Sequence, residues 1–243
     1  MPTDHPAPSG QAVVVGASGE IGAALAVMLA GLGLTPVLVG RDEERLTRVA
    51  AACAAESGGK PAVIRVADVT DRAALVDTMG AVADAGPVAV AVWAAGVFDW
   101  APVQRADPGR WGELLDTNLA SAAVFAAAVA PALVAAAPSC LVFIGSGAAH
   151  QAFANNAAYV ASKHGLAGLA GGTFLDLRDL GVKVSLVSPG LVAAGAGLLS
   201  PTGATEPERL LAPADVAAAV RFVVTFPGRG CPTVIRLEPQ RTP

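Results

Sequence analysis

One tyrosine and one lysine stand one helical turn apart in this sequence. Tyr159 is the only tyrosine among the 243 residues, and Lys163, one of three lysines, follows it by four positions. On a helix, positions i and i+4 lie on the same face, so the phenol and the ammonium would share one space. A nearby ammonium favours the phenolate and lowers the pKa of the phenol, which otherwise exchanges protons poorly at neutral pH. The alternative is a structural tyrosine at a helix edge beside a solvated lysine.

The composition indicates a well-packed globular protein. Hydrophobic residues make up 53% of the chain and charged residues only 15%, which argues against disorder. A net charge of −4 lacks the basic footprint of a nucleic-acid binder, so we expect no nucleic-acid partner. The three cysteines are widely separated and lack metal-ligand spacing. They predict reduced thiols in a cytoplasmic protein without a metal site.

One segment, residues 119–137, is long enough to suggest a membrane span because it carries no charge over nineteen residues. It is mostly alanine, which drives insertion weakly, and Pro131 interrupts it. We therefore expect a helix buried in the protein or at a subunit interface, and no membrane partner.

Apolar runs of strand length alternate with helical patterns along the chain. Continuous apolar strands separated by helices indicate a parallel sheet covered on both faces. The prediction is an α/β, Rossmann-like, doubly wound single domain over residues 11–243, preceded by a loose polar tail over residues 1–10. The predicted strands cover residues 12–16, 36–40, 62–68, 88–96, 140–146, 182–188 and 232–237.

Three glycines follow the first predicted strand. Gly16, Gly19 and Gly22 occupy the turn into the first helix, where backbone amides and the helix N-terminus can hold a pyrophosphate. The alternative is a tight turn without a ligand. The position of the triplet at the first strand–helix junction favours dinucleotide binding.

The residue after the second strand bears on the choice of dinucleotide. Arg41 follows this strand where many such folds place an acidic residue, and an arginine can bind a 2′-phosphate. The carboxylate comes one step later, at Asp42, where it can simply cap the next helix. The pattern favours NADP(H) over NAD(H). Asp68, at the end of the third strand, is expected near the adenine, with a cap or turn role as the alternative.

Taken together, these features resemble the single-domain branch of the short-chain dehydrogenases/reductases, over residues 11 to about 238. The family's Tyr-x-x-x-Lys motif stands here as Tyr159 and Lys163. Its catalytic serine, thirteen residues before the tyrosine, matches Ser146, and its helix asparagine matches Asn118. The family's Pro-Gly after a later strand matches the end of "SPG", residues 188–190.

The resemblance implies a role for each position. Tyr159 would exchange the proton, Lys163 would also bind the nicotinamide ribose, Ser146 would hold the substrate oxygen, and Asn118 would position a water leading to Lys163. The implied cofactor-binding residues are Gly16, Ser18, Gly19, Ile21, Gly22, Arg41, Asp68, Val69, Ala95, Gly96, Pro189, Gly190 and Val192. The implied substrate-lining residues are His150, Gln151, Phe153 and Leu191.

The sequence departs from the family pattern where the cofactor is expected. Glu20 stands in place of the middle glycine, so the triplet has the 16/19/22 spacing of the larger, extended branch. Trp93 and Ala94 replace the two asparagines of the Asn-Asn-Ala-Gly motif, and Ala194 replaces a threonine. These changes bear on cofactor orientation and leave the fold prediction untouched.

With the preference for NADP(H) that Arg41 suggests, the resemblance implies a carbonyl reductase or alcohol dehydrogenase. We expect it to be cytoplasmic and to assemble as a homodimer or homotetramer. Its substrate is expected to be small to medium, neutral and partly apolar, because residues 190–205 are rich in glycine and uncharged. Two alternatives stay open. One is a non-catalytic NADP(H)-binding sensor, although sensors usually lose the tyrosine–lysine pair. The other is a carrier-protein-linked ketoacyl reductase, although the C-terminus lacks the Asp-Gly-Gly ending frequent in that group.

Overall fold

The computed structural model describes residues 9–241, so most of the predicted loose tail, up to residue 8, lies outside the described residues. Seven strands form one parallel sheet in the order β3-β2-β1-β4-β5-β6-β7. The strands are β1 (Gln11–Val15), β2 (Thr35–Gly40), β3 (Val63–Val66), β4 (Val88–Trp93), β5 (Ser139–Ile144), β6 (Val182–Pro189) and β7 (Val234–Leu237).

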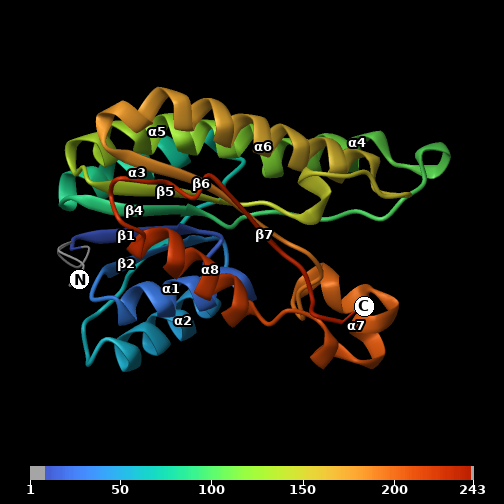
Figure 1. Cartoon of the computed structure of the whole chain (residues 1–243), viewed down its shortest axis with the longest axis horizontal. Helices are drawn as coiled ribbons and strands as arrows, with labels where there is room; N and C mark the ends of the chain where they lie inside the picture. Colours follow the sequence, from blue (N-terminus) through green and yellow to red (C-terminus); the bar gives the residue numbers. More distant parts are fainter. Residues whose placement is uncertain (1–8, 242–243) are drawn as a thin grey trace.

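Helices cover both faces of the sheet, which confirms the predicted doubly wound α/β single domain (Figure 1). One face carries α1, α2 and α8, and the other carries α3, α5 and α6. The helices are α1 (Glu20–Gly31), α2 (Glu43–Glu56), α3 (Arg72–Ala85), α4 (Pro108–Leu115), α5 (Ser121–Ala135), α6 (Ala157–Leu177), α7 (Pro201–Thr205) and α8 (Pro213–Thr225).

Side chains at the predicted helix starts explain where several helices begin. Asp42 caps α2 by accepting a hydrogen bond from the Arg45 amide, and Asp71 caps α3 in the same way through Ala74. Each cap satisfies one of the amides that the first helical turn leaves without a backbone partner. The capping role that the sequence left open for Asp42 is therefore confirmed.

The uncharged segment that resembled a membrane span is mainly α5. Among the described residues, the continuous helical stretch Pro108–Ala135 is long and apolar enough to cross a membrane, by length and composition only. The α5 part of it packs Phe125, Val129 and Leu133 into the core beneath the sheet, and α3 and α6 lie beside it.

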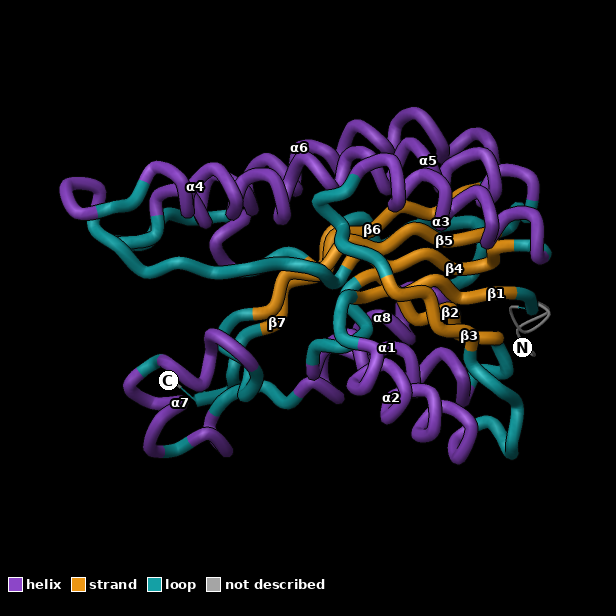
Figure 2. The backbone as a smooth tube through the Cα atoms, turned by 180° about the vertical axis from the view of Figure 1, so that it is seen from behind, coloured by secondary structure: helices purple, strands orange, loops and turns teal. Residues whose placement is uncertain are grey.

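The central strands reach one edge of the sheet, where β1, β4 and β5 end within a residue of one another and β6 runs on to Pro189. Val15 pairs with Trp93, Trp93 pairs with Phe143, and Phe143 pairs with Leu186, so β1, β4, β5 and β6 reach the same edge of the sheet. Ligands of open parallel sheets bind outside this carboxyl edge. The segments that continue from it carry every predicted site residue, and from it project an arm bearing α4 and a separate lobe bearing α7 (Figure 2).

Candidate active site

The structure brings the four predicted catalytic residues to the carboxyl edge from three different elements. Tyr159 and Lys163 lie one turn apart on α6, Ser146 follows β5, and Asn118 lies between α4 and α5. Of these, Asn118 and Lys163 are buried, whereas Ser146 and Tyr159 are half-buried and keep some access to solvent. A substrate can therefore reach Ser146 and Tyr159, whereas Asn118 and Lys163 lie behind them in the protein.

Tyr159 and Ser146 form the accessible pair. Ser146 begins a short 3-10 turn, and its hydroxyl accepts a hydrogen bond from the Ala148 amide at 3.2 Å. Burial raises the pKa of Tyr159, and an interaction with the Ser146 hydroxyl partly opposes that rise. The phenol is therefore protonated at neutral pH, as a proton donor must be.

Lys163 lies beneath this pair with 5% of its surface exposed. Its Nζ donates a hydrogen bond to the Ile144 carbonyl at 3.1 Å and lies 5.7 Å from the centre of the Tyr159 ring. Burial lowers the pKa of Lys163 from 10.5 to about 8, because the charged form loses hydration.

The pKa of Tyr159 is raised in the structure and not lowered as predicted, because burial is the largest effect on the phenol and outweighs what the nearby Lys163 charge contributes. Burial dominates at both groups, so it raises the pKa of the phenol and lowers that of the amine, favouring the neutral form of each. The ammonium lies over the ring and is bonded to the Ile144 carbonyl.

Asn118 lies in a π-helical turn, Asp116–Ala120, that interrupts the long helix. Such turns are frequent at functional sites. Its side chain exchanges two hydrogen bonds with the backbone of Val97, at 2.7 and 2.9 Å, and donates a third to Ser162 Oγ at 3.2 Å. The side-chain amide is engaged with protein partners, and the water that Asn118 is predicted to position stays a prediction. The side chain itself fixes the segment after β4 against α6.

The glycine turn after β1 has the form that a dinucleotide requires. Gly16 has a φ of +88°, and a Cβ there would lie 2.6 Å from the Ala95 amide nitrogen. A Cβ at Gly22 would collide with the Gly16 carbonyl oxygen. No contact within the protein requires glycine at position 19, because a Cβ there would make only an ordinary 3.5 Å contact. It begins α1 without a side-chain cap, so the first amides of this helix fit a pyrophosphate.

Glu20, the departure from the family's middle glycine, has a partner in the structure. Its carboxylate accepts a hydrogen bond from the Gly195 amide at 2.8 Å, across 175 residues of sequence. The glycine turn is thereby joined to the segment that follows β6. The sequence showed the substitution, but the partner depends on how that distant segment folds.

Arg41 and Asp68 lie together at the end of the adjacent strands β2 and β3. Their side chains form an ion pair at 3.6 Å, and Arg41 remains 71% exposed. Asp68 also accepts hydrogen bonds from the amide and the hydroxyl of Thr70, which are the main cause of its lowered pKa. Ser18 reaches the same corner, since a Cβ on Gly40 would lie 2.9 Å from its hydroxyl oxygen.

The remaining predicted cofactor residues fall into two groups. A Cβ on Gly96 would lie 3.4 Å from Asn118 Oδ1 and 3.7 Å from Lys163 Nζ, so the main chain passes close to these two catalytic candidates. By contrast, three predicted side chains pack at least partly into the core, so their contact with a cofactor would come from the main chain. They are Ile21, Val69 and Val192. The other positions, Ala95, Pro189 and Gly190, lie at the carboxyl ends of β4 and β6.

The predicted substrate residues are only partly brought together. His150 Nε2 lies 3.0 Å from the hydroxyl oxygen of the buried Ser188, which joins the segment after β5 to the end of β6. Burial is the main cause that lowers the pKa of His150. Gln151, Phe153 and Leu191 are exposed.

Sequence reasoning did not identify two residues that contact Tyr159, namely Phe98 and Ser162. Phe98 packs its ring against Tyr159 edge to face, with centroids 5.0 Å apart. Ser162 is fully buried and links Asn118 to the Tyr159 carbonyl. The available signals were an aromatic residue two positions after Gly96 and a serine next to the catalytic lysine, and neither is specific.

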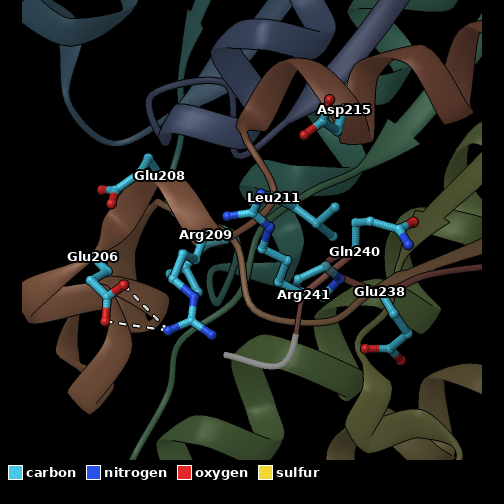
Figure 3. A pocket seen from close by; sticks show the side chains of 10 residues that line it. Glu206, Glu208, Arg209, Leu211, Asp215, Glu238, Gln240 and Arg241 are labelled. Carbon is cyan, nitrogen blue, oxygen red and sulfur yellow. Dashed lines mark hydrogen bonds and ion pairs between the residues drawn. The ribbon is translucent and has the colours of Figure 1, made fainter.

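Two cavities open along this edge. One, of about 440 Å³, has Arg41, Thr70, Phe98 and Arg110 among its lining residues. A larger one, of about 670 Å³, lies between residues 206–211 and residues 238–241, and its walls carry charges of both signs (Figure 3). The lining of neither cavity includes any of the four catalytic candidates.

The fold and site together define an oxidoreductase built on a dinucleotide-binding sheet, and comparison with known proteins agrees. A family model described as short chain dehydrogenase matches residues 11–200. The chain belongs to the short-chain dehydrogenase/reductase family.

Individual relatives span nearly the whole chain. An uncharacterized oxidoreductase from Staphylococcus saprophyticus is 29% identical over 219 residues, covering 89% of this chain and 91% of the relative. Gluconate 5-dehydrogenase from Gluconobacter oxydans is 32% identical over 184 residues, covering 75% and 71%. The crystal structure of a metagenomic short-chain oxidoreductase in complex with NADP has a TM-score of 0.83 and 31% identity, covering 98% of this chain and 100% of that one.

Proposed function

We propose that this protein is an NADP(H)-dependent reductase of ketones or aldehydes, which also runs in reverse as an alcohol dehydrogenase. The observation that carries the proposal is the joint placement of Ser146, Tyr159 and the buried Lys163 beside the glycine turn. The bound dinucleotide would supply the hydride. The substrate expected is a small to medium, neutral and partly apolar carbonyl compound.

The side chains of this protein account for the rest of the chemistry. The Ser146 hydroxyl would donate a hydrogen bond to the substrate oxygen and stabilise charge as it develops there. The neutral Tyr159 phenol would deliver its proton to the same oxygen. Lys163 lies over the ring, where its positive charge would stabilise the phenolate left behind.

Preference for NADP(H) rests on the corner made by Arg41, Ser18 and Asp68. We expect Arg41→Ser and Arg41→Asp to narrow or reverse the preference for NADPH over NADH. A hydrogen bond to a charged group contributes about 1.5–3 kcal/mol, which corresponds to at least about a tenfold change in affinity. The Ser variant avoids placing a second carboxylate beside Asp68. The measurement is fluorescence titration with both cofactors.

A matched control for this titration is Arg48→Asp. Arg48 lies on α2 and is paired with Glu44, so it is an exposed arginine away from the proposed phosphate site. It should leave the preference unchanged. Tighter binding of NADH than NADPH by the wild type would contradict the proposed role of Arg41.

We further propose that the protein assembles as a homodimer or homotetramer through α5 and α6. Most outward positions of these helices are small or apolar and include Ala127, Pro131, Ala161 and Leu175, whereas His164 and Asp176 are the polar exceptions on α6. A broad apolar face of this kind is rarely left in water. We expect a light-scattering mass of two or four chains at micromolar concentration, reduced by Ala127→Glu. Ala51→Glu, on the exposed side of α2, is the control, and a wild-type mass of one chain would contradict the proposal.

Cytoplasmic location is also part of the proposal. All three cysteines are free thiols in the structure, and Cys53 and Cys140 are buried. Free thiols are typical of a reducing compartment.

A further inference from the structure

A line of aromatic rings leads away from the candidate proton donor. The Phe98 ring lies 5.0 Å from the Tyr159 ring at an angle of 75°, and the Trp100 ring lies 6.2 Å from Phe98 at an angle of 44°. We call Phe98 and Trp100 the aromatic strip. Edge-to-face and tilted contacts at these separations are the arrangements that aromatic rings prefer. The strip therefore continues from the site of chemistry to the surface without a gap.

The backbone holds the aromatic strip in place. Asn118 binds both the amide and the carbonyl of Val97, the residue before the strip. The Ala101 amide, directly after the strip, donates a hydrogen bond to the Asn155 carbonyl at 2.9 Å, four residues before Tyr159. Both ends of the strip are thus tied to the elements that carry the catalytic residues.

The outer end of the strip exposes much apolar surface. Trp100 is 64% exposed, and Val103 on the same segment is 68% exposed. The charge between the two rings, Asp99, is 18% exposed at its side chain and paired with Arg110 at 3.6 Å. The strip therefore presents an aromatic surface, and the acidic side chain between its two residues is mostly buried and paired with Arg110.

A second apolar surface projects from the same edge of the sheet. Leu198 and Leu199, just before α7, are 37% and 81% exposed, and their lobe projects from the sheet in the same direction as the α4 arm (Figures 1 and 2). The lobe is tied to the glycine turn through the hydrogen bond from Gly195 to Glu20. The segments after β4 and β6 thus both offer apolar side chains at the carboxyl edge, where a substrate would bind.

We infer that the substrate is an aryl-substituted ketone or aldehyde, whose ring lies against Phe98 and Trp100 within a few bonds of the carbonyl. The inference rests on the proposed reductase function and goes further by naming the group that the site recognises. Because the strip begins at the Tyr159 ring, the group that covers it belongs to the molecule whose carbonyl reacts there. Phe98 and Trp100 are the specificity-determining residues.

The test uses two ketones that differ only in the ring, 4-phenyl-2-butanone and 4-cyclohexyl-2-butanone, with 2-butanone as the truncated reference. Two carbons separate ring and carbonyl, so the intrinsic reactivity of the carbonyl is the same in both. The kcat/KM for NADPH-dependent reduction should be about tenfold higher for the phenyl compound, as an aromatic contact permits. Trp100→Ala should abolish this ratio, and Trp100→Phe should keep most of it.

The control is Phe222→Ala, which removes an exposed aromatic ring from α8 on the other side of the sheet and should leave the ratio unchanged. Equal kcat/KM for the two ring compounds, or a ratio that survives in Trp100→Ala, would overturn the inference while turnover itself upholds the reductase. Failure of the wild type to reduce any of the three ketones would overturn both. Dissociation of Trp100→Ala into monomers, against an oligomeric wild type, would assign Trp100 to a subunit interface and overturn the inference.

Discussion

Replacing Tyr159 with phenylalanine should lower the turnover of ketone reduction by at least about a hundredfold, the lower end of what a positioned general acid supplies. The substitution removes one oxygen atom and keeps the ring. The edge-to-face contact with Phe98 and the position of Lys163 over the ring can therefore persist. The fold and the affinity for NADPH should stay nearly unchanged. The measurement is NADPH oxidation with a ketone, alongside NADPH binding by fluorescence.

Ser146→Ala is the companion variant for this experiment. It removes the hydroxyl proposed to hold the substrate oxygen and should act mainly on turnover, with NADPH binding preserved. A Tyr159→Phe protein that reduces its ketone at the wild-type rate would refute the mechanism. If instead the wild type binds NADPH tightly but turns over none of a broad panel of carbonyl compounds, the non-catalytic sensor becomes the better interpretation.

The sheet could be predicted from sequence because burial leaves a strong pattern. Strands covered on both faces must be apolar throughout, and β4 and β5 are buried along their whole length. The ends of strands were harder to predict. The apolar run of residues 88–96 continues beyond Trp93, where β4 stops, because small apolar residues suit both a strand and the close approach of the glycine turn.

The catalytic residues were predicted from fixed spacings, whereas their electrostatics were not. Spacing places Lys163 beneath Tyr159, but the pKa of each depends on how completely other segments cover them. The same limit applies to partners that come from distant parts of the chain. Nothing local to Glu20 indicates that its carboxylate binds Gly195, and nothing local to Arg41 indicates its ion pair with Asp68.

Removing the Lys163 side chain should impair both cofactor binding and turnover. Lys163→Ala should lower turnover and also weaken NADPH binding, because this side chain is proposed to support the Tyr159 phenolate and to bind the nicotinamide ribose. Lys163→Met is the better-matched variant, since it keeps much of the volume of the buried side chain and removes only the charge and the hydrogen bond to the Ile144 carbonyl. A Lys163→Met enzyme with wild-type turnover and wild-type NADPH affinity would contradict both assignments.

The lowered pKa of Lys163 also predicts opposite pH dependences for activity and stability. As pH rises through about 8, the ammonium of Lys163 loses its proton in the folded protein, so kcat/KM for reduction should fall. This fall should be absent from the pH profile of Lys163→Met. Unfolded chains keep the proton up to about 10.5, so they bind more protons than the folded state between the two values. The free energy of unfolding of the wild type, relative to Lys163→Met, should therefore rise from pH 8 to 10.5. Urea titrations across this interval measure it. A constant difference would show that Lys163 titrates as an exposed lysine does, and a falling one would show that folding raises its pKa; either would contradict the prediction.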